Sequence, residues 1–259
     1  MGMTAVVGID LGARNTFLAY LDNKGNPRIL ENEFGEKFTA SAVFSDGNET
    51  IVGTEAYRMK QIDPDSVATE FKRHMGTDKV YELTGGDMTP VELSAVILKT
   101  LGAHAESQLG DLGQVVITTP ANASNSAREA TRSAGHLAGF DVGPEIKDPT
   151  AAALYYSYTQ SIAPGIYFVY DFGGGTWDIS AVKVEGTTVE VLWSNGIKEC
   201  GGSDFDTAMG DLIKELYEGE TGEDMDGSIQ TISYEEVKKS LSQRDQRRVT
   251  VQGSSGPPT

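Results

Sequence analysis

The sequence predicts an α/β fold built from two similar halves, and three observations support this prediction. Strand and helix patterns alternate through the first part of the chain, which is typical of βαβ units. A strand-rich pattern opens the chain and returns from Gly165 onward. The 259 residues, 39% of them hydrophobic, are enough for one large domain or two of moderate size.

The elements follow one another in a regular order. Residues 5–12 form an apolar strand, and residues 16–30 predict a hairpin with its turn at 23–25, because β-branched and aromatic residues flank turn formers. Residues 89–109 predict a long helix, since Thr89 suits the N-cap and Pro90 the first helical position.

The middle of the chain continues the alternation. A short apolar strand is expected at 114–120, followed by helices at 125–140 and 149–160. Three strand patterns then occupy residues 165–172, 176–186 and 187–196, before a helix is expected at 203–219.

The two strand-rich openings form an internal repeat. At one constant offset, each copy reads apolar strand, Asp-x-Gly, small or polar loop, apolar strand and glycine turn. The matched positions are Asp10, Gly12, Leu18, Leu21 and Gly25 in the first copy and Asp171, Gly173, Ile179, Val182 and Gly186 in the second.

Two such loops could face each other across a cleft and direct backbone N–H groups at one anion. Glycines at 173, 174 and 175 allow close approach of the backbone, and the strand-end aspartates could face a cation held by the same anion. For either loop alone, a simple tight turn explains the pattern as well. The pairing of the two loops favours function.

Composition narrows the classes of partner. Acidic side chains outnumber basic ones by 38 to 21, giving a formal net charge of −17, so a nucleic-acid backbone would be repelled. The chain has no signal-peptide pattern and no apolar run near the ~20 residues that span a bilayer. We therefore expect no nucleic acid, no membrane and a cytoplasmic location. The only cysteine, Cys200, is expected to be a small buried side chain rather than a redox switch.

Several motifs together resemble one family. They are "GIDLG", "FKRHMG", "VVITTPANASNSAREATRSAGHLAG", "KDPTAAALYY", "YDFGGGTWDIS", "GGSDFD" and "EEVKKSLS". Their order and spacing are similar to those of the ATPase domain of the seventy-kilodalton heat-shock chaperones, the DnaK-like family. The resemblance covers nearly the whole chain and implies the actin-like ATPase fold, which is ribonuclease-H-like, with two lobes on duplicated β-sheet cores.

The resemblance also implies the division of the chain. Residues 1–165 would form the first lobe with its inserted subdomain, and residues 166–259 the start of a second, incomplete lobe. The chain ends in a polar stretch at 252–259, before the family's later adenosine loop and peptide-binding domain. We therefore expect a truncated member.

The phosphate side of the implied site lies in the two loops. Asp10 and Asp171 would hold a hydrated Mg²⁺ through water, between the lobes. Backbone amides would cradle the phosphates of ATP or ADP, at Gly12, Ala13, Arg14 and Asn15 and at Gly173, Gly174, Gly175 and Thr176.

Four residues would carry the hydrolysis that the resemblance implies: Lys72, Asp148, Asp171 and Thr176. Lys72 would supply positive charge to the transferring phosphoryl group, although by itself a lysine is more often solvated. Thr176 would contact the γ-phosphate or its water, and Asp178 the adjoining network. Asp148 replaces the family's glutamate, which shortens its reach, and an aspartate before proline can equally be a helix N-cap.

The first loop departs further from the family. Ala13 and Arg14 replace two threonines. The backbone amides are kept, Ala13 lacks a hydroxyl, and Arg14 adds a positively charged side chain whose direction the sequence does not show. We expect nucleotide binding to survive these changes.

The adenosine side is implied by a charged helix and a glycine pair. The helix contributes Glu235, Lys238, Lys239 and Ser242, and the pair is Gly201 and Gly202. Without the resemblance, the helix would be an ordinary amphipathic helix and the glycines a helix-entry turn.

The resemblance predicts an ATP-binding and ATP-hydrolysing chaperone domain, whose lobe closure regulates a peptide-binding domain. By family analogy, its partners are a J-domain co-chaperone, a nucleotide-exchange factor and an unfolded peptide. Pro120 and Arg128 match positions that relay the nucleotide state. The alternatives are a divergent nucleotide-binding module with little hydrolysis, acting as a regulator or scaffold, and an actin-fold small-molecule kinase.

Overall fold

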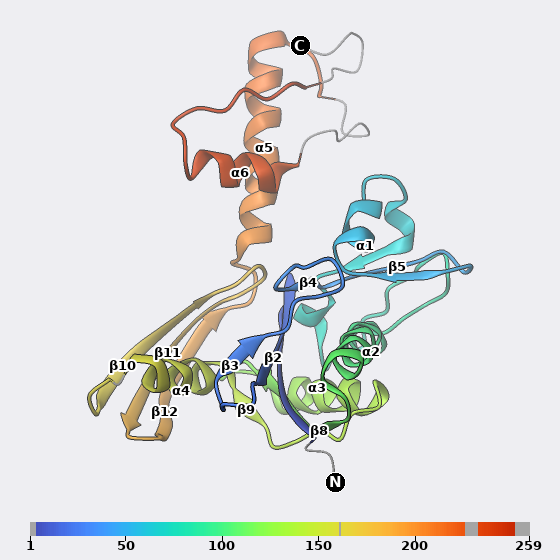
Figure 1. Ribbon diagram of the computed structural model, residues 1–259. Helices are drawn as coiled ribbons and strands as arrows, with labels where there is room; N and C mark the ends of the chain where they lie inside the picture. The colour runs from blue at the N-terminus through green and yellow to red at the C-terminus, as the bar shows by residue number, and fades with distance from the viewer. Residues whose placement is uncertain (1–3, 161, 226–232, 252–259) are drawn as a thin grey trace. The chain divides into compact units, whose positions relative to one another are not determined.

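The computed structural model describes residues 4–160, 162–225 and 233–251. The chain divides into two compact units, Met1–Lys198 and Glu199–Thr259, and each is described by itself (Figure 1). The predicted lobe boundary between residues 165 and 166 stays a prediction, and the predicted polar stretch at 252–259 lies outside the described residues.

The first unit is built on a mixed sheet. Its strands lie in the order β3-β2-β1-β8-β9, with β4 paired to β2. Their bounds are β1 Ala5–Leu11, β2 Asn15–Leu21, β3 Pro27–Ile29, β4 Thr39–Ala40, β8 Leu112–Thr119 and β9 Ile146–Lys147. The strands β1 and β8 are parallel, as are β8 and β9, so the predicted βαβ units are present.

Two helices pack against this sheet (Figure 1). The helix α2 (Pro90–Leu109) begins as predicted, because Thr89 and Glu92 form a capping box. The helix α3 (Asn125–Leu137) ends three residues before the predicted 140, because Gly139 adopts a φ of 95°, which does not continue a right-handed helix. The shared core contains fully buried Val7, Ile9 and Leu11 of β1 and Leu93, Ile97 and Leu98 of α2.

A small subdomain occupies much of the segment between β4 and α2, for which no helix or strand is assigned from the sequence. Its elements are β5 Ala42–Ser45, β6 Thr50–Val52, α1 Thr54–Met59, η1 Pro64–Ser66, β7 Val67–Thr69 and η2 Phe71–His74. Phe71 of the short helix η2 is buried in the main core. This packing holds η2 in place, and with it the backbone of Lys72, the next residue.

The second hairpin region forms a separate three-stranded antiparallel sheet, β10-β11-β12, at residues Gly165–Phe172, Trp177–Glu185 and Thr188–Ile197. The helix α4 (Asp148–Gln160) covers one face of it, with Ala153 packed against Val182 and Val184. The three predicted strands are therefore confirmed to within two residues.

The internal repeat extends to the pairing register. Asp10 lies opposite Phe17, and at the same offset Asp171 lies opposite Asp178. The correspondence ends in the third strand, because Leu21 pairs with Pro27 whereas its counterpart Val182 pairs with Val191. The hairpin that contains the loop is thus the duplicated unit.

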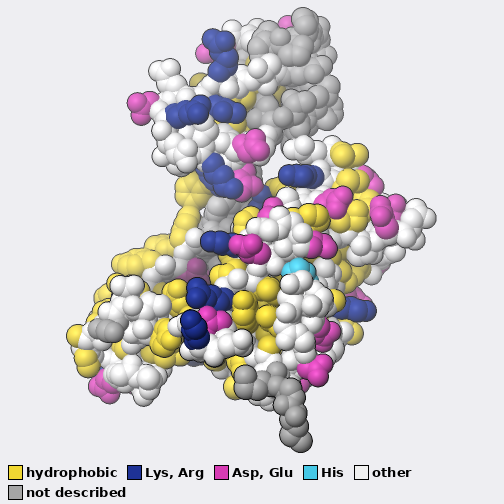
Figure 2. Space-filling model, viewed as in Figure 1, with side chains coloured by type: hydrophobic (Ala, Val, Ile, Leu, Met, Phe, Trp, Pro, Cys, Tyr) yellow, Lys and Arg dark blue, Asp and Glu magenta, His cyan; other side chains and the backbone are white. Residues whose placement is uncertain are grey.

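Matched side chains of the two copies differ in their exposure to solvent. Val7, Ile9 and Leu11 are 1%, 1% and 0% exposed, whereas their counterparts Phe168, Tyr170 and Phe172 are 62%, 67% and 54% exposed. Apolar side chains are visible over this sheet in Figure 2.

The second unit consists of α5 (Gly202–Thr221) and α6 (Tyr234–Leu241). Its small core joins Ile213 and Tyr217 of α5 to Val237 of α6 and to Val251. Gly210 of α5 allows close packing, since a Cβ there would lie 2.7 Å from the ring of Tyr234. In the described part of the chain, no helix has the length and apolar character needed to span a bilayer.

Candidate functional site

The first loop, residues 12–15, is held from one side by Ser41. The Ser41 hydroxyl donates to the Gly12 carbonyl at 2.7 Å, and the Ser41 amide donates to the Arg14 carbonyl at 2.8 Å. A trans peptide directs its C=O and N–H in opposite directions, and no cis bond occurs among the described residues. The amides of Ala13 and Asn15 therefore point away from Ser41, as an anion cradle requires.

The second loop, residues 173–176, lies directly against the first. It closes with a hydrogen bond from the Gly173 amide to the Thr176 carbonyl at 2.9 Å. A Cβ on Gly174 would overlap the Cβ of Arg14, and one on Gly175 would lie 2.7 Å from the Cβ of Ala13. Glycine is needed here because the two loops are in contact.

Carboxylates gather beside the two loops. Desolvation by burial raises the pKa of Asp171 to about 6, and the negative charges of Asp148, Asp10 and Asp178 contribute in that order. Burial also raises the pKa of Asp10, partly offset by Lys72. The structure thus brings together four aspartates from both halves, and desolvation penalises the charged forms of Asp10, Asp171 and Asp178.

Two basic residues of η2 lie on the same side. Lys72 is close enough to Asp10 and Asp171 for its positive charge to offset part of the rise in the pKa of both. The Arg73 Nε lies 2.8 Å from the position of a Cβ on Gly175, and the Arg73 guanidinium pairs with Glu70 at 3.4 Å. Glu70 adopts a φ of 58°, a left-handed conformation that is unusual for a residue other than glycine.

Asn122 is a member of the cluster that sequence reasoning missed. Its Nδ2 donates to Asp178 Oδ1 at 2.7 Å, between residues 56 positions apart. Desolvation raises the pKa of Asp178, and the hydrogen bonds from Thr176 and Asn122 oppose that shift. No sequence signal identifies Asn122, because it lies in an irregular loop after β8.

Asp148 is the first residue of α4. Its Oδ1 is buried and accepts no hydrogen bond from the part of the chain that the structure describes. A buried carboxylate oxygen of this kind is costly unless a ligand or water supplies a donor. This observation favours a binding role over a purely structural N-cap.

The predicted adenosine residues lie in the second unit. Lys238 Nζ lies 2.6 Å from Asp206 Oδ1 and also donates to the Gly202 carbonyl at 2.6 Å. Lys239 pairs with Glu235 at 2.7 Å along α6, and the Ser242 hydroxyl donates to the Lys238 carbonyl at 3.3 Å.

These contacts join α5 to α6 at the glycine pair. The Gly201 amide donates to Asp204 Oδ2 at 2.7 Å, which opens α5. Cys200 is partly buried. The predicted adenosine residues are therefore neighbours within their own unit.

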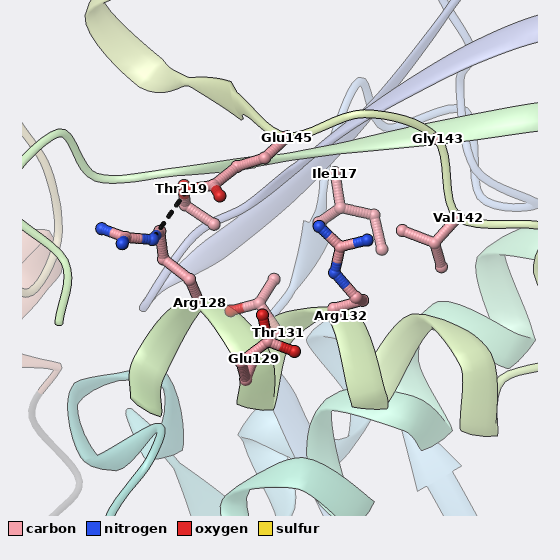
Figure 3. A pocket seen from close by; sticks show the side chains of 9 residues that line it. All are labelled: Ile117, Thr119, Arg128, Glu129, Thr131, Arg132, Val142, Gly143 and Glu145. Atoms are coloured by element: carbon pink, nitrogen blue, oxygen red, sulfur yellow. Dashed lines mark hydrogen bonds and ion pairs between the residues drawn. The ribbon is translucent and has the colours of Figure 1, made fainter. Parts of the chain in front are cut away.

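A small pocket lies beside Arg128 (Figure 3). Its volume of about 20 Å³ suits a water molecule and is far too small for a nucleotide. Arg128 Nε pairs with Glu145 at 3.2 Å, and the Thr119 hydroxyl donates to Glu145 at 3.0 Å. The Arg128 guanidinium also donates to the Ala123 carbonyl, one residue from Asn122. The predicted relay residue is thus tied to the loop that contacts Asp178.

The donor set fits a hydrated cation beside a phosphate group. Asp10, Asp148, Asp171 and Asp178 concentrate negative charge, which a divalent cation would relieve. The described residues contain no group of three or more His, Cys, Asp or Glu side chains arranged to bind a metal directly. A cation held through water, as oxygen-ligated Mg²⁺ often is, agrees with this geometry.

Comparison with protein-family models gives one match that covers almost the whole chain. The model described as "Hsp70 protein" matches residues 6–255. The match spans the loops of both hairpins, the carboxylate cluster and the second unit.

Proposed function

The chain belongs to the Hsp70 protein family, and from this premise we propose that it binds Mg-ATP and hydrolyses it to ADP and phosphate. The family assigns it a nucleotide-binding, chaperone-type domain with the actin-like ATPase fold.

One observation carries the proposal: the two loops of the duplicated hairpin touch each other beside a cluster of four carboxylates. Gly174 and Gly175 allow no side chain against Arg14 and Ala13, and the carboxylates of Asp10 and Asp171 have raised pKa values. Perturbed titratable groups that gather at a close backbone approach mark functional sites. Backbone amides at the loops suit phosphate oxygens, which an acidic protein could not otherwise attract.

We assign the chemical roles from position and charge. Lys72 supplies positive charge where the phosphoryl group and the attacking water would meet. Asp148 Oδ1, buried without a donor among the described residues, accepts a hydrogen bond from that water. Thr176 orients the γ-phosphate or the water, while Asn122 holds the neighbouring Asp178 in place.

The cation would be held by Asp10 and Asp171 through its water shell. A bound Mg²⁺ would supply positive charge to the β- and γ-phosphate oxygens. The carboxylates must be ionised to hold it, so we expect its affinity to fall below pH 6, where Asp171 becomes protonated.

The biological setting is proposed from the family. Closure of the lobes around nucleotide would regulate a peptide-binding domain outside this chain, with a J-domain co-chaperone and an exchange factor as partners. We also propose a cytoplasmic location, since the chain's single cysteine suits a reducing compartment.

A single-turnover assay of ATP hydrolysis with Mg²⁺ tests the proposal. We expect the wild-type chain to release phosphate and Thr176→Ala to release it at least ~10-fold more slowly, because an oriented contact to the reacting group is lost.

Asp10→Asn combined with Asp171→Asn should weaken Mg-ATP binding, which can be measured by calorimetry. Unchanged Mg-ATP affinity in the double variant would contradict the metal assignment.

A second candidate is a module that binds ATP and hardly hydrolyses it, and the short side chain of Asp148 favours it. Lengthening that residue by Asp148→Glu separates the two candidates. If reach limits the rate, the glutamate variant should hydrolyse ATP ~10- to 100-fold faster at unchanged ATP affinity. Asp141→Glu, on the exposed turn after α3, is the matched control and should change nothing.

A further inference from the structure

Arg14 joins three separately folded parts of the first unit. Its backbone belongs to the loop between β1 and β2, and its Cβ lies against Gly174 of the second loop. Its guanidinium carbon lies 3.6 Å from the ring centroid of Tyr57, on α1 of the small subdomain. No other residue of the first loop contacts an aromatic ring in this way among the described residues.

Tyr57 is a firm support for this contact. It packs against the small core formed by Ala42, Phe44 and Ala56, and its amide donates to the Gly53 carbonyl at 2.9 Å. A guanidinium within about 6 Å of an aromatic centroid is attracted by the ring electrons, and stacking suits its planar shape. The guanidinium of Arg14 therefore stacks on the subdomain.

The fixed side chain also limits the position of the second loop. Gly174 approaches Arg14 so closely that a Cβ at 174 would overlap the Arg14 Cβ. At the next position, the Arg73 guanidinium lies against Gly175. The loop at 173–175 is thus bounded by two arginine side chains that come from outside its own hairpin.

We propose that Arg14 and Tyr57 form a brace that holds the two glycine loops at the separation a chain of phosphates requires. Arg14 acts as a positioning residue: through its contact with Tyr57 and the second loop, it sets the affinity for the phosphates. The part of this inference that concerns phosphates rests on the proposed function, whereas the bracing of the loops can be measured without nucleotide.

Hydrogen exchange of the nucleotide-free chain tests the brace directly. Arg14→Met keeps the stem and the backbone amide and removes the charge, and Tyr57→Leu removes the ring. Each change should speed exchange in the segment 173–176 by ~3- to 10-fold, the size expected when a cation–π contact is lost. Tyr57→Phe keeps the ring and should retain the wild-type rate.

Matched controls come from the same structure. Arg28→Met removes an exposed arginine paired with Asp22 in the turn after β2, and Tyr158→Leu removes an exposed tyrosine of α4. Both should leave the exchange of segment 173–176 unchanged. Wild-type exchange of this segment in both Arg14→Met and Tyr57→Leu would overturn the brace.

Nucleotide affinity gives the second readout. ATP reaches both loops with its phosphates, whereas AMP lacks the β- and γ-phosphates. Arg14→Met and Tyr57→Leu should therefore raise the Kd for ATP by ~3- to 10-fold. The Kd for AMP should stay unchanged. An equal loss for ATP and AMP would indicate general damage and overturn the positioning role. If the wild-type chain binds no ATP, the proposed function fails, while the exchange experiment still decides the brace.

Discussion

At the scale of single residues, the clustered aspartate carboxylates of the first unit lower the stability of the fold. Asp171 lies near three other aspartates, and desolvation raises its pKa to about 6. Asp148 keeps a buried oxygen without a donor among the described residues. Such groups are retained where a ligand compensates for them, which is why they indicate a site.

The raised pKa of Asp171 predicts a pH dependence of stability. The folded chain holds this proton more tightly than the unfolded chain, whose carboxyl keeps its ordinary value of 3.8. Between pH 3.8 and about 6 the native state therefore binds more protons, and its stability falls as the pH rises through that window. We expect Asp171→Asn to melt at a higher temperature than the wild type at pH 7.5 and at nearly the same temperature at pH 4.

Thermal melts of the nucleotide-free chain across this range provide the measurement. Asp87→Asn, which changes an exposed aspartate, is the control and should follow the wild-type curve. A constant difference between Asp171→Asn and the wild type at every pH would contradict the assigned pKa.

At the scale of elements, the duplicated hairpin is the unit that matters. Its first two strands repeat in identical register, and this brings Asp10 and Asp171 to equivalent strand ends. The two turns are chemically different, because the first is held by Ser41 and the second is occupied by three glycines. Contact between the turns requires small residues in the second one.

The three glycines of the second turn should respond differently to alanine. At Gly174 and Gly175 a Cβ would overlap the side chains of Arg14 and Ala13, whereas at Gly173 the nearest atom would be 3.6 Å away. Overpacking of this kind costs about 1–3 kcal/mol. We expect Gly174→Ala and Gly175→Ala to lower the free energy of unfolding by that amount, and Gly173→Ala to change it by less than ~0.5 kcal/mol.

Urea denaturation followed by circular dichroism measures these differences. Equal effects at all three positions would show that backbone conformation, and not contact between the loops, selects glycine.

At the scale of the whole molecule, the two halves of the repeat are unequal. The first copy is buried beneath α2 and the neighbouring core, while the same positions of the second copy carry exposed Phe168, Tyr170 and Phe172. Contiguous apolar surface of this kind favours association with other apolar groups.

This surface should bind an apolar dye. We expect the folded chain to enhance the fluorescence of 8-anilinonaphthalene-1-sulfonate, and Phe168→Ser combined with Phe172→Ser to reduce the enhancement at least ~2-fold without lowering the melting temperature, because neither side chain is buried. Leu137→Ser, an exposed apolar residue at the end of α3, is the control. Equal dye binding by the double variant and the wild type would place the dye site elsewhere.

The order of the long elements, the repeat and the family resemblance are all readable in the amino-acid sequence. Capping residues such as Thr89, apolar periodicity and turn glycines are local signals, and they located α2 and β10 to β12 to within two residues. The two loops were singled out from the same local signals, because a duplicated Asp-x-Gly pattern is visible in the sequence.

Which side chains meet depends on how the chain folds. The contact of Asn122 with Asp178, the direction of Arg14 toward Tyr57 and the raised pKa of Asp171 depend on residues far apart in the chain. The short strands of the small subdomain were missed because they carry too few residues for a periodic pattern. Local propensity defines the elements, whereas burial and charge in the folded chain define the chemistry of the site, since both depend on long-range packing.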